Sequence, residues 1–179
     1  RTLKSLVGVS VHEAMHSWYQ GLLASNEALF AWMDEGFTCY ASNRIEKELF
    51  PEDFSDTHAG SYKGYKRIAT SDYEEPLCTH ADHFDTNWAY GTASYSKGVV
   101  VLDQLSHIVG QKVIDKSLKR YFGEWAYKHP NASDFKRIVE KESGIELDWY
   151  FEYFVNTTKT IDYSIHEIMG DEKGTQILL

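Results

Sequence analysis

Two histidines four positions apart are the clearest chemical feature of this 179-residue chain. Residues 12–16 read His-Glu-Ala-Met-His, and Glu35 follows His16 after eighteen intervening residues. On an α-helix, side chains at positions i and i+4 lie on one face one turn apart, so both imidazoles can reach a single ion. A catalytic zinc ion takes three protein ligands and leaves one coordination position for water. His12, His16 and Glu35 therefore form a candidate set of zinc ligands.

Glu13 is the candidate general base. It is adjacent to His12 and points away from the helix face that His12 shares with His16. Water on a catalytic zinc ion has a pKa of about 7, and a nearby carboxylate can take its proton and pass it on. The glutamate of a helical His-Glu-x-x-His motif has this role. The motif also occurs by chance on solvated helices, so Glu35 is what makes the interpretation specific.

Two helices must position these side chains. The first shows apolar residues at offsets of three and four, without proline: Leu6, Val7, Val11, Met15, Trp18, Tyr19, Leu22 and Leu23. We predict that Ser5 caps this helix and that it ends near Ser25-Asn26. A second helix is predicted over residues 31–49, which carry Glu35. The glycine after Glu35 costs roughly 1 kcal/mol in a helix interior, so it indicates close packing or a close backbone approach.

Helices are also predicted for most of the remaining chain. They are expected at residues 61–69, 93–109, 112–128 and 147–155, and between a cap at Asn131 or Ser133 and a C-cap at Gly144. Residues 71–93 lack clear periodicity and predict a long loop across the cleft. The tail from Thr160 to Ile168 alternates apolar and polar residues, which predicts a strand, and Asp171–Gly174 would turn that strand into a hairpin.

The motifs and their order resemble those of the M1 family of zinc aminopeptidases, in the gluzincin group. His-Glu-x-x-His is followed by Trp18, and Trp32-Met33-Asp34-Glu35-Gly36-Phe37 is similar to the family's Trp-Leu-Asn-Glu-Gly-Phe. Tyr95-Ser96-Lys97-Gly98 is similar to the family's Tyr-x-Lys-Gly. Asp148-Trp149-Tyr150-Phe151 and Asn156-Thr157-Thr158 are similar to the end of its catalytic domain. The resemblance extends over nearly all of residues 5–165.

The resemblance implies a mainly α fold, the helical lobe of a thermolysin-like gluzincin metallopeptidase catalytic domain, with a short β segment at the C-terminus. Residues 1–160 would form the helical part, and residues 161–179 would begin a following β segment.

The resemblance also implies roles for single residues. His12, His16 and Glu35 would be the zinc ligands, and Glu13 would act first as general base and then as general acid. Tyr95 would donate its hydroxyl to the oxyanion of the tetrahedral intermediate, which a neutral phenol can do because its pKa is ordinarily about 10. Asp34 would be either an outer partner of a ligand or an ordinary surface acid.

One family segment has no counterpart in residues 1–179. It is Gly-x-Met-Glu-Asn, whose glutamate grips the free α-amine of the substrate. Only eleven residues precede His12, too few for the β-rich lobe that forms the other wall of the family's cleft. We therefore interpret the sequence as a fragment of a longer catalytic domain. It should bind zinc, yet hydrolyse peptides poorly or not at all, because positioning supplies much of catalysis.

The leading functional hypothesis is zinc-dependent hydrolysis of peptide substrates with release of N-terminal residues. A zinc endopeptidase or an epoxide hydrolase of related fold would use the same site, and the residues upstream of Arg1 would distinguish them. A third hypothesis is a non-catalytic peptide-binding module with a vestigial metal site. The retention of all three ligands, the base and Tyr95 argues against it.

The composition excludes several other partners. The net charge of −9 and the pI of about 5.3 argue against nucleic acid or an anionic membrane surface. No stretch approaches the roughly 20 apolar residues of a membrane span. Cys39 and Cys78 do not form a Cys-x-x-Cys pair, so a cysteine zinc site is not indicated. Cys39 is interpreted as a small buried residue, and a disulfide between the two cysteines stays open.

Overall fold

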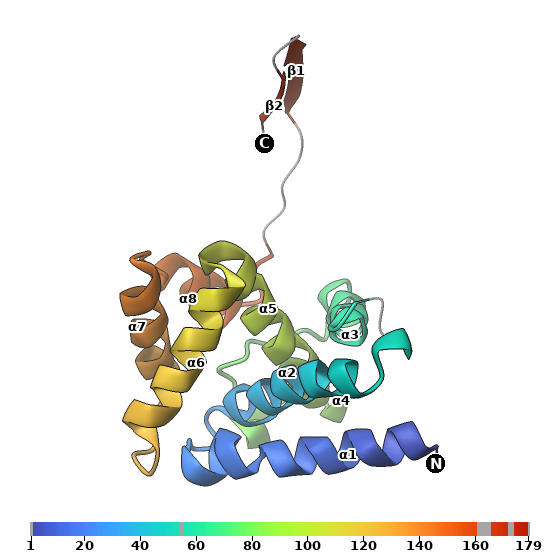
Figure 1. The fold of residues 1–179 in the computed structure, drawn as a ribbon, viewed down its shortest axis with the longest axis vertical. Coiled ribbons are helices and arrows are strands. Elements are labelled where there is room, and N and C mark those ends of the chain that lie inside the picture. The colour runs from blue at the N-terminus through green and yellow to red at the C-terminus, as the bar shows by residue number, and fades with distance from the viewer. Residues whose placement is uncertain (1, 54–55, 161–165, 172–173, 179) are drawn as a thin grey trace.

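The computed structural model describes residues 2–53, 56–160, 166–171 and 174–178, and most of these residues are helical (Figure 1). The helices and helical turns are α1 (Leu3–Met15), η1 (Ser17–Leu22), α2 (Ala31–Leu49), η2 (Pro51–Asp53), α3 (Ala59–Ala69), η3 (Ala81–His83), α4 (Asn87–Gly91), η4 (Thr92–Lys97), α5 (Gly98–Val109), α6 (Gln111–Trp125), α7 (Ala132–Ser143) and α8 (Asp148–Phe154). Two strands, β1 (Glu167–Asp171) and β2 (Gly174–Leu178), pair antiparallel. The mainly α fold with a short C-terminal β segment is thus confirmed.

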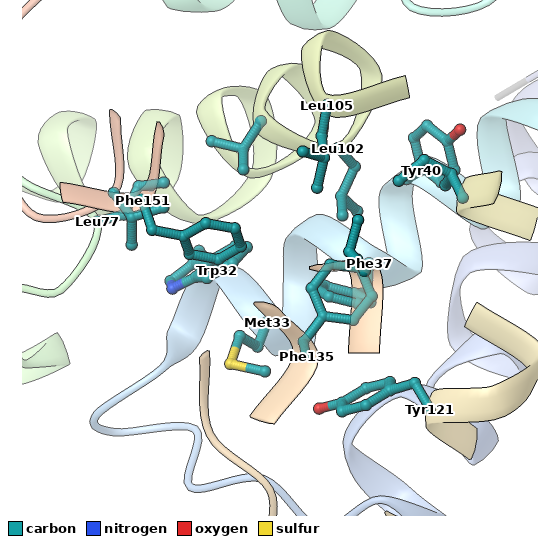
Figure 2. Close-up of a cluster of buried hydrophobic side chains, with 14 of the residues drawn as sticks. Trp32, Met33, Phe37, Tyr40, Leu77, Leu102, Leu105, Tyr121, Phe135 and Phe151 are labelled. Atoms are coloured by element: carbon teal, nitrogen blue, oxygen red, sulfur yellow. The ribbon is translucent and has the colours of Figure 1, made fainter. Parts of the chain in front are cut away.

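Helix α2 is the central element of the helical part. It contacts α1, α5 and η4, and Figure 1 shows α1 alongside it. Trp32 and Phe37 of α2 are each 1% exposed, and the Phe37 ring packs against Tyr121 at 5.9 Å and Phe135 at 4.9 Å between ring centroids. Figure 2 shows this cluster of apolar side chains. Because buried aromatic side chains dominate core energetics, the core fixes the position of α2, the helix that carries Glu35.

The prediction of one continuous first helix, capped by Ser5, is wrong. Thr2 is the N-cap, since its side chain accepts a hydrogen bond from the backbone nitrogen of Ser5, and α1 ends at Met15. A kinked segment, η1, follows, in which the backbone of Tyr19 and Gln20 is not helical and Gln20 has a positive φ of 86°. A Cβ on Gly21 would lie 2.7 Å from the carbonyl oxygen of His16, so glycine permits this tight turn. The apolar periodicity continues through the turn, which is why the pattern does not reveal it.

Other predicted elements agree better with the structure. Helix α2 has the predicted bounds. The side chain of Asn131 caps α7, and Gly144 ends it in the left-handed conformation, at φ 73°. The loop predicted over residues 71–93 contains the short helix α4, which the Thr86 side chain caps by accepting a hydrogen bond from the backbone nitrogen of Ala89. A helix of five residues is too short to show a periodic pattern, so that prediction is wrong in part.

The C-terminal prediction is confirmed in part. The strand expected from Thr160 to Ile168 begins at Glu167, and residues 161–165 lie outside the described part. Asp171 and Gly174 face each other at the end of the antiparallel ladder, as the hairpin prediction requires. None of the described helices is long and apolar enough to span a membrane.

A buried ion pair holds η4 in place. The Lys97 ammonium donates to Glu74 Oε1 at 2.7 Å and to the carbonyl oxygen of Thr157 at 3.3 Å. The Lys97 side chain is 1% exposed, and that of Glu74 is 8% exposed. Burial lowers the pKa of Lys97, and the Glu74 carboxylate opposes that effect. The pair therefore joins η4 to the segment before α4 and to the chain that follows α8.

We expect Glu74→Gln to lower the free energy of unfolding by about 3 kcal/mol. Removing one partner of a buried ion pair leaves the other charge uncompensated, which costs roughly 3–5 kcal/mol. Asp72→Asn is the matched control, because Asp72 is exposed and only two residues away. That change should stay within about 0.5 kcal/mol in urea unfolding. Equal effects of the two substitutions would contradict the structural role of the pair.

Candidate metal centre

Three potential ligand atoms converge between α1 and α2. The Nε2 atoms of His12 and His16 are 3.1 Å apart. Oε2 of Glu35 lies 3.2 Å from Nε2 of His12 and 3.4 Å from Nε2 of His16. Ligand atoms bound to one tetrahedral zinc ion at about 2.0–2.1 Å are roughly 3.3–3.4 Å from one another. The three side chains therefore have the spacing of a zinc-ligand set.

The Glu35 carboxylate supports the same interpretation. Its Oε2 atom is buried and forms no hydrogen bond with any described residue. A buried carboxylate oxygen without a partner is costly, and a cation between it and the two imidazoles would remove that cost. Within the described ranges, His12, His16 and Glu35 are the one group of His, Cys, Asp and Glu side chains that could hold a metal ion.

The end of α1 carries both histidines. His12 is in its last turn, and His16 is the C-cap residue with helical backbone angles, φ −58° and ψ −18°. The backbone nitrogen of His16 donates to the carbonyl oxygen of His12 at 3.3 Å, so the relation between positions i and i+4 survives although the α-helix ends between them. Glu35 comes from α2, which contacts α1. Glu13 is exposed on α1 beside His12.

Asp34 and Thr38 contact the second nitrogen of His16. Oδ1 of Asp34 is 2.7 Å from Nδ1 of His16, and Oγ1 of Thr38 is 3.2 Å from it. Asp34 is only 8% exposed, so it is not an ordinary surface acid. Burial raises the pKa of Asp34 to about 6, although His16 acts to lower it. A carboxylate that accepts the outer N–H of a metal-bound histidine fixes the orientation of the ring and its tautomer.

Cys39 contacts the second nitrogen of His12. Its Sγ atom lies 3.7 Å from Nδ1 of His12, whereas the sequence prediction treats it only as a small buried residue. Cys39 and Cys78 are both free thiols, so the disulfide that the sequence leaves open does not form. The sequence contains a signal for this contact. Cys39 follows Glu35 by four residues and Thr38 follows Asp34 by four, so α2 presents two adjacent stripes to the two imidazoles.

Tyr95 lies against the same group. Its hydroxyl donates to Oε1 of Glu35 at 2.6 Å, and its ring stacks on that of His12 with 6.0 Å between centroids. Burial and the Glu35 carboxylate raise the pKa of Tyr95, so the phenol is neutral at ordinary pH. The structure therefore gives Tyr95 a partner that the sequence did not suggest, the carboxylate oxygen of Glu35 that faces away from the imidazoles.

The glycine after Glu35 has the close backbone approach that the sequence predicts. A Cβ on Gly36 would lie 2.8 Å from the Cα of Gly98. Gly98 begins α5, directly after the η4 segment that carries Tyr95. The contact between Gly36 and Gly98 thus brings the helix of Glu35 against the segment of Tyr95.

The charges around the three ligand atoms favour a cation. Contact with Cys39, and then with Glu35, raises the pKa of His12 to about 10, against the effect of burial. Burial raises the pKa of Glu35, but the neighbouring His12 and Tyr95 outweigh it and the net pKa is lowered. A raised pKa on the histidine and a lowered pKa on the carboxylate are the directions that close opposite charges produce.

Residues 1–154 match the sequence profile of the peptidase family M1 domain. The chain belongs to peptidase family M1. Its M1 relatives include aminopeptidase B of Rattus norvegicus, 31% identical over 163 residues, which are 87% of this chain and 23% of the relative. Leucine aminopeptidase 2 of Neurospora crassa is 30% identical over 140 residues, 74% of this chain and 21% of the relative. The chain thus spans less than a quarter of the length of these relatives.

The M1 fold is also seen in solved structures. The M1 zinc metallopeptidase of Deinococcus radiodurans superposes with a TM-score of 0.69 at 20% identity, over 87% of this chain and 34% of that one. A mutant of a Deinococcus radiodurans M1 zinc metallopeptidase, solved with a Tyr-Ser-Ala substrate, gives the same TM-score at 19% identity. These similarities establish that this chain has the M1 fold, as the resemblance in the sequence implies.

Proposed function

We propose that this chain carries the zinc centre of a metallopeptidase that releases N-terminal residues from peptides. The observation that carries the proposal is the spacing of the three ligand atoms, at 3.1, 3.2 and 3.4 Å. The names of its relatives, aminopeptidase B and leucine aminopeptidase 2, support the exopeptidase part. The division into a helical part, residues 1–160, and the start of a β segment, residues 161–179, belongs to the same proposal.

His12, His16 and Glu35 would hold the metal. When bound, zinc would acidify a water molecule and polarise the carbonyl group of the scissile bond. Glu13 is exposed next to His12, so it can accept a proton from the attacking water and deliver it to the leaving amine. Asp34 and Thr38 would hold the His16 ring in the orientation that presents Nε2.

Tyr95 would act in two ways. Its hydroxyl donates to Glu35 Oε1, which fixes the plane of the carboxylate that binds the metal. As negative charge develops on the former carbonyl oxygen, the same neutral hydroxyl can donate to it, because a preorganised donor is worth several kcal/mol there. Exchange between the two acceptors would make Tyr95 both a positioning residue for Glu35 and the oxyanion donor.

The test combines a measurement of metal content with one substitution. Zinc-loaded chain should contain about one zinc per molecule by elemental analysis. Glu13→Gln should keep that zinc and lower kcat/KM for an aminoacyl-coumarin substrate by about 10²–10⁴-fold. Glu48→Gln is the control, because Glu48 is exposed at the far end of α2 and should leave both quantities unchanged. Unchanged turnover in Glu13→Gln would refute the assignment of the base.

Exopeptidase action has its own readout. We expect slow turnover by this chain, so the assay needs protein in excess over substrate. A peptide with a free N-terminus should lose single residues from that end, and the same peptide with an acetylated N-terminus should stay intact. Internal cleavage of the acetylated peptide would favour an endopeptidase instead. Loss of single residues from the acetylated peptide as fast as from the free one would overturn the exopeptidase part of the proposal.

A further inference from the structure

The two imidazoles of the candidate metal centre have unlike outer partners. Nδ1 of His16 faces the carboxylate of Asp34 at 2.7 Å, a strong and charged acceptor. Nδ1 of His12 faces the thiol sulfur of Cys39 at 3.7 Å. Cys39 is half-buried and free, and it lies one helical turn after Glu35 on α2. One turn of α2 therefore carries both the candidate ligand Glu35 and Cys39, the outer partner of the candidate ligand His12.

The geometry fixes which nitrogen of His12 needs a partner. The Nε2 atoms of His12 and His16 and the Glu35 carboxylate oxygen point at one place. An imidazole that binds a metal through Nε2 carries its proton on Nδ1, and the group that accepts this proton sets the tautomer and the ring orientation. In His12 the group at that position is the sulfur of Cys39. Sulfur is a weak acceptor, so this contact is weaker than one with a carboxylate oxygen.

We propose that Cys39 is a positioning residue of the metal centre, whose sulfur accepts the Nδ1–H of His12 and holds that ring for the metal. The inference rests on the proposed metal centre, since it assigns one of its outer contacts. It does not make Cys39 a ligand, because the sulfur lies on the Nδ1 side of the ring and the convergent atoms lie on the Nε2 side. Loss of the acceptor should weaken metal binding without removing a ligand.

The experiment compares zinc affinities of three variants of the chain by competition with a chromophoric chelator. Cys39→Ala removes the acceptor, and the dissociation constant should rise about 10-fold, at the lower end of the 10–100-fold range for lost outer partners because sulfur accepts weakly. Cys39→Ser should recover part of this loss, since its hydroxyl oxygen can accept the same N–H. Cys78→Ala, which changes the exposed cysteine, should bind zinc like the wild type.

A spectroscopic readout separates positioning from a general loss of stability. In zinc-loaded wild type, the Nδ1–H of His12 should give a slowly exchanging imidazole proton signal in a nitrogen-edited NMR spectrum. That signal should vanish by fast exchange in Cys39→Ala and persist in Cys78→Ala. A simple packing defect would lower the melting temperature and leave the signal in place.

The outcomes are distinct. Equal zinc affinity of Cys39→Ala and Cys78→Ala, or a persistent His12 signal in Cys39→Ala, overturns the role of Cys39 while the metal centre stands. Failure of wild-type chain to bind zinc overturns both the metal centre and this inference. If Cys39→Ala does not fold, Cys39→Ser is the test of the proposal. A zinc affinity of Cys39→Ser more than about 10-fold below that of the wild type would contradict the view that the serine hydroxyl replaces sulfur as the acceptor.

Discussion

Glu35→Gln should abolish the binding of zinc at micromolar zinc concentrations. The change keeps the size and shape of the side chain but replaces a carboxylate ligand with an amide, which is a poor ligand for zinc. Loss of an outer partner already costs 10–100-fold in metal affinity, so loss of a direct ligand should raise the dissociation constant more than about 100-fold. Chelator competition measures the dissociation constant directly, without any need for catalytic turnover.

Asp34→Asn is the matched control for this prediction. Asp34 precedes Glu35 on α2 and carries the same charge, but it faces Nδ1 of His16 rather than the convergent Nε2 atoms. Its substitution removes one negative charge from the same site and leaves an amide oxygen that can still accept the N–H. We expect a loss of affinity of about 10-fold. Equal losses for the two substitutions would mean that overall charge, and not ligation by Glu35, holds the metal.

The candidate ligands can be predicted from the sequence because their positions follow from local rules. His12 and His16 need only a helical turn between them, and the turn survives even where α1 ends. Gly36 predicts a close backbone approach, because glycine lowers the stability of a helix interior and so needs a reason outside the helix. The pattern could not say which backbone would approach it, since Gly98 is 62 residues further along the chain.

The outer contacts were harder to predict because they depend on how one helix is rotated against another. Asp34 and Cys39 lie on stripes of α2 that the sequence defines, but only the packing of α1 decides that they meet His16 and His12. The kink in η1 is not predicted from the sequence for a different reason. Its apolar residues continue the spacing of α1, so the positive φ of Gln20 leaves no trace in the pattern.

Gly36→Ala should destabilise the chain by about 2 kcal/mol, although alanine is the better helix former. The new methyl group would lie 2.8 Å from Cα and 3.0 Å from the carbonyl carbon of Gly98, and 3.2 Å from the carbonyl oxygen of Ser94. These are backbone atoms, so they cannot rotate away as a side chain would. Overpacking of this kind costs typically 1–3 kcal/mol, with this site at the upper end, and the gain in helix propensity offsets about 1 kcal/mol.

Gly123→Ala is the control that isolates the contact. Gly123 lies in α6, and a Cβ there meets nothing within 4 Å, so only the helix propensity changes. That variant should be more stable than wild type by up to about 1 kcal/mol, opposite in sign to Gly36→Ala. Urea unfolding of the two variants and wild type measures both effects. Stabilisation by both substitutions would show that α2 and α5 do not meet at Gly36 and Gly98.

The same substitution should also weaken the metal centre. Relief of the clash requires α2 to move away from the start of α5 by several tenths of an ångström, and the η4 segment with Tyr95 moves with α5. The 2.6 Å bond from the Tyr95 hydroxyl to Glu35 Oε1 then lengthens, and the Glu35 carboxylate loses the contact that fixes its plane. Gly36→Ala should therefore bind zinc less tightly than Gly123→Ala, which links the helix crossing to the geometry of the ligands.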